Sequence, residues 1–298
     1  MSAPPKLGFL RGVIATLGAW FIYSLIWLFG RSHKRVDVKW LDGPLGDAVI
    51  GDAPFQAVAD REGLTIERTA ESGGLIPRFE QLRAPTFDCD KVQPLVRHFY
   101  ENTTDFTFDV WSRTYFPANI VLFLLVTTIS RQVNQLNFPL SPLDTATGIS
   151  SEIILMREPD GNVRYTGWFR QLAKQELVLY TGFYMTKVVP KESGPCVKVV
   201  FPMPNGNATV ILRPKVDDTG ALVLDSGGGA FGGAGFYRVQ ARGTERLRVW
   251  KIRTLREQFR VYVDDAGVVR CDHSVGFLGM PVLKLHYKMV RKPERAAA

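Results

Sequence analysis

The chain has 298 residues, of which 46% are hydrophobic, and a net charge of +8. This length can bury a substantial core without disulfide or metal support, and it suits one large domain or two small ones. The three cysteines, Cys89, Cys196 and Cys271, are an odd number at wide spacing. That spacing excludes a disulfide framework and a clustered metal site, so we expect reduced thiols, no metal and no cofactor.

The first predicted element is a membrane anchor. Residues 12–30 carry no charge, and nineteen helical residues span about 28 Å, close to the thickness of the hydrocarbon layer. Arg31, Lys34 and Arg35 follow as a basic stop. The sequence therefore predicts a single-pass anchor within 1–35. A cleaved signal peptide, a buried core helix and an interfacial helix are the alternatives. The basic surplus after the span, together with the reduced thiols, favours a cytoplasmic main domain.

Residues 36–150 are predicted to form a mixed, largely helical region. The expected elements are a helix over 52–62, a strand over 63–68, a helix over 91–105 and a strand over 106–111. An apolar helix is expected over about 117–136, where the charge-free run is short for a membrane span. A buried core helix is the favoured interpretation of this run. A helix dipping into the membrane and a second span are the alternatives.

From Ser151 onward, short apolar runs alternate with turn sequences such as 159–162, 217–220 and 264–267. Strands are predicted at 151–158, 163–170, 176–188, 196–202, 208–214, 221–226, 236–241, 247–253, 259–264, 268–273 and 281–290. Many short strands joined by tight turns favour a large antiparallel sheet that curls or closes into a β-barrel. The predicted class is α+β, mainly β, with 151–290 forming one globular unit with 36–150. We expect a disordered tail at 291–298.

The strand at 176–188 is apolar on both faces, which predicts cover on both sides. Leu177, Leu179, Phe183 and Met185 alternate with Val178, Tyr180 and Tyr184. The expected covers are the 117–136 helix and a barrel interior. Aromatic residues that could line an apolar ligand cavity are Trp111, Trp168, Phe183, Tyr184 and Trp250. Plain core packing is the alternative for each of them.

The candidate acid–base residues are His273 and His286, which fall on the last two predicted strands. Neither lies in a catalytic motif. The sequence 227–232 matches G-x-G-x-x-G, but strands are predicted on both sides, so it lacks the helix that a dinucleotide site needs. Glu101, Asp105 and Asp109 would share one acidic helix face if the run is helical.

The positive charge is concentrated in two regions. Residues 242–298 carry 13 Lys or Arg against 6 Asp or Glu, and residues 31–39 carry four against one. Beside an anchor, an anionic membrane surface is the expected partner, and no nucleic acid is expected. The leading hypothesis is a membrane-anchored protein that binds a lipid or another apolar small molecule. An enzyme acting on a lipid-like substrate and a structural or interaction protein at the membrane surface are the alternatives. The sequence determines neither the ligand nor the oligomeric state.

Overall fold

The computed structural model describes residues 24–46, 50–68, 73–117, 149–172 and 178–293. Its helices are η1 (Arg35–Leu41), α2 (Ala53–Glu62), η2 (Phe79–Leu82), η3 (Cys89–Lys91), α3 (Pro94–Glu101) and η4 (Thr103–Asp105), after a short helical stretch at 24–29. Its strands are β1 (Arg31–Lys34), β2 (Thr65–Arg68), β3 (Phe106–Thr114), β4 (Ile149–Arg157), β5 (Val163–Leu172), β6 (Val178–Val188), β7 (Pro195–Met203), β8 (Gly206–Val216), β9 (Leu222–Asp225), β10 (Gly235–Arg242), β11 (Arg246–Ile252), β12 (Leu255–Val263), β13 (Val269–Phe277) and β14 (Met280–Arg291).

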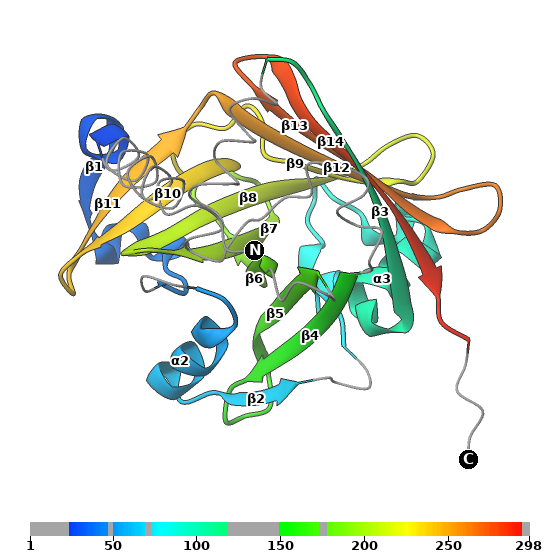
Figure 1. Ribbon diagram of the computed structural model, residues 1–298, viewed down its shortest axis with the longest axis horizontal. Coiled ribbons are helices and arrows are strands. Elements are labelled where there is room, and N and C mark those ends of the chain that lie inside the picture. The colour runs from blue at the N-terminus through cyan, green and yellow to red at the C-terminus, as the bar shows by residue number, and fades with distance from the viewer. Residues whose placement is uncertain (1–23, 47–49, 69–72, 118–148, 173–177, 294–298) are drawn as a thin grey trace, which may run out of the picture.

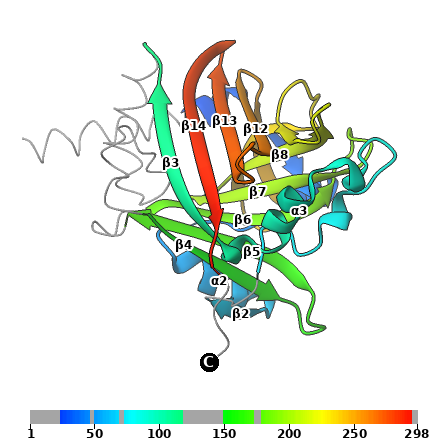
Figure 2. The same cartoon turned by 90° about the vertical axis from the view of Figure 1, so that its right-hand side faces the viewer.

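The strands form one sheet of 14 strands, and its main path runs β2-β4-β5-β6-β7-β8-β9-β12-β13-β14-β3. Along one side of β8 lies β7, while the other side is shared by β10 and β9. The sheet therefore divides at β8 into a short limb (β10, β11, β1) and a long limb (β9, β12, β13, β14, β3). Figure 2 shows the long limb standing across β4–β7, with α3 in the angle between them.

The mainly β, antiparallel class with few helices is confirmed, but the closed β-barrel is not observed. Among the described strands the main path ends at β2 and β3, so the sheet is curled and open. The sheet also divides at β8 into two limbs, so its described strands do not form one ring of partners. Each strand predicted between 151 and 290 is present, with ends that differ by a few residues.

Turn chemistry explains why those strands could be located from sequence. Asp217 Oδ1 accepts hydrogen bonds from the backbone N–H groups of Thr219 and Ala221. Asp264 Oδ1 does the same for Ala266 and Val268. In both turns the aspartate carboxylate accepts hydrogen bonds from backbone N–H groups that have no backbone acceptor within the turn. A glycine with positive φ, Gly220 or Gly267, follows in each turn.

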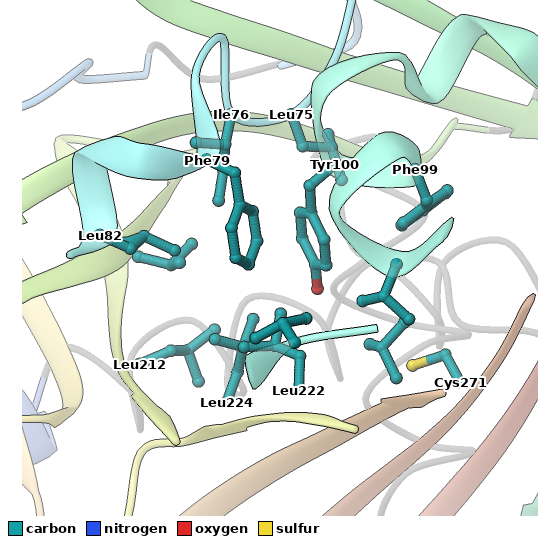
Figure 3. Packing of buried hydrophobic residues seen from close by; sticks show 14 of the residues in the cluster. Leu75, Ile76, Phe79, Leu82, Phe99, Tyr100, Leu212, Leu222, Leu224 and Cys271 are labelled. Atoms are coloured by element: carbon teal, nitrogen blue, oxygen red, sulfur yellow. The ribbon is translucent and has the colours of Figure 1, made fainter. Parts of the chain in front are cut away.

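The concave face of the curled sheet packs against η2, η3 and α3. Figure 3 shows Phe79 and Tyr100 pointing from η2 and α3 toward Leu212, Leu222 and Leu224 of the sheet. All five side chains are at most 5% exposed. This layer is the largest hydrophobic cluster, and it holds α3 inside the curl (Figure 1).

The convex face is covered locally by α2, which packs on β4, β5 and β6. Phe55 and Val58 of α2 contact the cluster that contains Ile154, Phe169 and Phe183. The two-sided cover of β6 is therefore confirmed, with α2 on one side and the concave core on the other. The helix predicted over 117–136, which was expected to cover β6, lies almost entirely outside the described residues.

The amino-terminal segment adds a strand where the sequence predicted a basic stop. Residues Arg31–Lys34 pair as β1 with β11, so these basic residues belong to the sheet edge. In the described part of the chain no helix is both long and apolar enough to cross a membrane. Residues 12–23 of the predicted span lie outside that part.

The helix predicted over 91–105 is shorter than expected. It covers Pro94–Glu101, and the chain continues through η4 into β3. Glu101, Asp105 and Asp109 therefore do not share a helix face: Glu101 accepts a hydrogen bond from the backbone N–H of Phe79, and Asp109 lies on β3.

Candidate functional site

Six polar or ionisable side chains gather on the concave face of the curled sheet, and we call them the interior cluster. They come from five strands on the two sides of the curl. The members are Arg170 (β5), Tyr180 and Tyr184 (β6), Glu257 (β12), His273 (β13) and Tyr287 (β14). Period-2 alternation carries all six to the face that also presents the hydrophobic core cluster.

Arg170 is the most unusual member, because the residue is only 2% exposed and its guanidinium lies among aromatic rings. The carbon Cζ lies 5.4 Å from the ring centre of Phe108, 5.1 Å from that of Trp168, 5.9 Å from that of Tyr180 and 5.7 Å from that of Tyr287. Within the described structure, Nε and Nη2 have no hydrogen-bond partner, and no carboxylate forms an ion pair with Arg170. Cation–π contacts offset part of the cost of burying this charge, but two of its nitrogens are left without an acceptor among the described residues.

The three tyrosines place neutral hydroxyl groups beside this cation. Burial raises the pKa of Tyr180, Tyr184 and Tyr287, while the positive charge of Arg170 acts in the opposite direction on Tyr180 and Tyr287. These hydroxyls therefore stay protonated near neutral pH and can donate hydrogen bonds. All three residues nevertheless keep an intermediate accessible surface.

His273 and Glu257 form a buried pair. His273 Nε2 lies 2.6 Å from Glu257 Oε1, and the imidazole stacks on Phe259 at a centroid distance of 3.9 Å. The second ring nitrogen, Nδ1, is buried and has no partner in the described residues. The ring of Tyr287 lies on the other side of the imidazole, 6.4 Å away between centroids, so the pair adjoins the surroundings of Arg170.

The residues singled out from sequence lie in different places. Trp168, Tyr184 and His273 face the concave side, and Trp168 Nε1 donates to Ser151. His286 lies on the convex face of β14, where it contacts Asp272 and the ring of Trp111. The separation follows from alternation, since His286 is adjacent to Tyr287, which faces inward.

The other two aromatic candidates are also away from the interior cluster. Phe183 packs against Phe55 of α2 on the convex face, with ring centroids 4.9 Å apart. Trp250 lies near the amino-terminal end and stacks on Phe29. Arg170 and Glu257 were not among the residues predicted from the sequence. Strand parity could have found Arg170, because it lies two residues from Trp168 on the same strand.

Metal and nucleotide chemistry receive no support from the described residues. Across the described ranges, no group of three or more His, Cys, Asp or Glu side chains could hold a metal ion. The glycine-rich sequence 227–232 connects β9 to β10 without a helix. The ammonium group of Lys251 donates to the carbonyl oxygens of Gly229, Ala230 and Ala234 in and beside this loop. The loop therefore presents carbonyl oxygens to a cation, whereas a phosphate cradle presents N–H groups.

No family model and no solved structure matches the chain. The chain is similar to a protein of Bacillus subtilis (strain 168) described as "Uncharacterized membrane protein YndJ", with 25% identity over 228 residues. The similarity covers 75% of this chain and 39% of that relative. The chain thus matches well under half the length of the relative.

Proposed function

We propose that this chain is a membrane-associated protein that binds an amphipathic small molecule inside its curled sheet, with an anionic group of the ligand at Arg170. A fatty acid or another anionic lipid has the required chemistry. The observation that carries the proposal is the buried guanidinium, which has unused donors and no carboxylate partner among the described residues. A buried charge without a counter-ion is expensive, and an anionic ligand group removes that cost.

The surroundings of Arg170 suit the apolar part of such a ligand. Phe108, Tyr180, Tyr184, Phe201 and Tyr287 pack against the concave core but stay partly accessible. Burial raises the pKa of Tyr180, Tyr184 and Tyr287, so their hydroxyl groups are neutral hydrogen-bond donors beside Arg170. Deep side chains that keep accessible surface are typical of the lining of a ligand site.

Membrane association is supported by two further observations. The charge-free sequence 12–30 has the length of a membrane span, and the similar Bacillus subtilis protein is described as a membrane protein. The buried, unpaired thiols of Cys89, Cys196 and Cys271 agree with a cytoplasmic main domain.

The test of ligand binding is a titration of the full chain, in nanodiscs of neutral lipid, with a fluorescent long-chain fatty acid. Replacing the guanidinium by an apolar chain of similar length, Arg170→Met, should weaken binding about tenfold or more, because charge-assisted hydrogen bonds are lost. The methyl ester of the same probe should bind Arg170→Met and the parent equally.

Lys198→Met is the matched control. It also removes one buried basic side chain from the sheet, but Lys198 shares the convex side of β7 with Val200. We expect parent-like affinity for the fatty acid in this variant. If Arg170→Met binds the fatty acid as tightly as the parent does, the proposal is wrong.

A second function, an enzyme acting on the bound molecule, is favoured by the buried His273–Glu257 pair. A carboxylate that fixes one imidazole nitrogen while the other stays free is the arrangement of a general base. Incubation of the bound ligand with the parent should then yield a product of altered mass, and His273→Gln should abolish the change. If the ligand is recovered unaltered from both proteins, the enzyme hypothesis is wrong and ligand binding alone is the proposed function.

A further inference from the structure

We infer that one end of the sheet is a membrane-contacting edge that binds an anionic bilayer, with the tip of the β13–β14 hairpin as its apolar contact. This inference does not depend on a ligand in the interior. The edge consists of exposed apolar side chains from three separate segments. They are Trp27, Leu28 and Phe29 of the amino-terminal helix, Phe116 after β3, and Phe277, Leu278 and Met280 of the hairpin tip, each between 42% and 80% exposed.

Backbone contacts show that these segments share one end of the sheet. The N–H of Leu278 donates to the carbonyl oxygen of Thr254, in the β11–β12 turn, at 2.8 Å. The N–H of Tyr115 donates to the carbonyl oxygen of Val282 at 3.2 Å, which places the end of β3 beside the hairpin.

The amino-terminal helix is attached to the same end through β11. Phe29 stacks on Trp250 with ring centroids 5.6 Å apart, and Arg248 Nε donates to the carbonyl oxygen of Ile26 at 3.0 Å. β11 then runs from Trp250 to the β11–β12 turn. In Figure 1 and Figure 2 the hairpin tip and the end of β3 lie together at the top of the molecule.

The hairpin tip has an unusual residue for its backbone. Phe277 pairs with Met280, which leaves a two-residue turn of Leu278 and Gly279. Both turn residues have positive φ, 52° and 80°, a conformation that favours Asn or Gly in this kind of turn. The other described non-glycine residue with positive φ is an asparagine, Asn205. A leucine at this position is strained in its backbone and 62% exposed. An apolar surface outside the chain would account for the exposed side chain.

Charge selects the partner. Segments 24–34, 113–117, 248–256 and 276–284 together contain eight Lys or Arg and no Asp or Glu. At the other end of the long limb, the turns at 216–221 and 263–268 contain four Asp and no Lys or Arg. Arg256 of this set forms an ion pair with Asp225, and the remaining positive charge beside the apolar tip complements an anionic lipid surface. The same charge opposes docking of a second copy through this edge. Residues 24–30, the described end of the charge-free sequence, lie at this edge.

The experiment is depth-dependent quenching of a fluorophore attached to the full chain. Met280→Cys places an environment-sensitive label on the tip, and Phe277→Cys is a second labelled position. Ala266→Cys is the matched control, because Ala266 is exposed in the β12–β13 turn, about 30 Å away along the strands. The native thiols are buried, and the labelled parent measures their background. The protein is reconstituted in vesicles of phosphatidylcholine and phosphatidylglycerol whose acyl chains carry a quencher.

We expect blue-shifted emission and at least threefold stronger quenching at positions 280 and 277 than at position 266. We also expect the quenching at the tip to fall in pure phosphatidylcholine. Equal quenching at 280, 277 and 266 overturns the inference. A blue shift without quenching also overturns it, because the tip then lies against protein. Unchanged quenching in pure phosphatidylcholine overturns the choice of an anionic surface.

Discussion

Two buried cations illustrate at the residue scale how a structural charge differs from a candidate binding charge. Lys198 is fully buried, and its ammonium group donates to the carbonyl oxygens of Trp40 and Asp42. It therefore fastens the end of η1 and the residue that follows it to the convex face of β7. Arg170 is equally buried, but two of its nitrogens have no partner in the described structure. The ammonium group of Lys198 has hydrogen-bond acceptors within the chain. The guanidinium of Arg170 has N–H groups from which a ligand can accept hydrogen bonds.

Lys198 gives stability a defined dependence on pH. Burial is the main cause that lowers the pKa of Lys198 from 10.5 to about 7, followed by repulsion from Lys187. At pH values between these two pKa values, the lysine is protonated in the unfolded chain and largely neutral in the folded chain. The unfolded chain then binds more protons, so the free energy of unfolding rises with pH. From pH 7 to pH 9 this residue should add about 2 kcal/mol. Denaturant unfolding of the parent and Lys198→Met at both pH values measures the difference. An identical change with pH in the two proteins would refute the assignment.

At the scale of single elements, the strands and α2 were predictable, whereas the end of α3 was not. Turn signals such as Asp217 and Asp264 act within a few residues, so the strand limits follow from local sequence. The helix predicted to 105 ends at Glu101 for a different reason. Thr103 Oγ1 donates to the carbonyl oxygen of Phe99 and accepts from the N–H of Leu75, which lies far away in sequence. Such a contact is invisible in a local pattern.

The packing of α2 against β5 can be tested by adding a single methyl group to Gly167. A Cβ built on Gly167 would lie 2.4 Å from a ring carbon of Phe55, in the first turn of α2. Gly182 pairs with Trp168 on the neighbouring strand, and its Cβ would meet other side chains at 3.3 Å or more. We expect Gly167→Ala to lower the free energy of unfolding by about 1–3 kcal/mol through overpacking, and Gly182→Ala to change it by less than about 1 kcal/mol. Chemical denaturation measures both. Equal effects would show that α2 does not pack closely on Gly167.

At the scale of the whole molecule, the open, two-limbed sheet could not be predicted from the sequence. Alternation assigns Trp168, Tyr184 and His273 to one face of their strands, but it does not say which strands share β8. That choice rests on contacts between residues far apart in the chain. The strand order also decides which inward-facing residues contact one another. The contact between Arg170 and Tyr287 therefore could not be predicted without the fold.

The most direct test of the proposed ligand site is native mass spectrometry of the full chain, released gently from membranes and compared with Arg170→Met. The parent should carry an additional mass that corresponds to an anionic amphipathic molecule. Arg170→Met should be recovered without it, while Lys198→Met should retain it. A parent without any bound mass, or the same bound mass in the parent and Arg170→Met, would contradict a ligand site at the buried guanidinium.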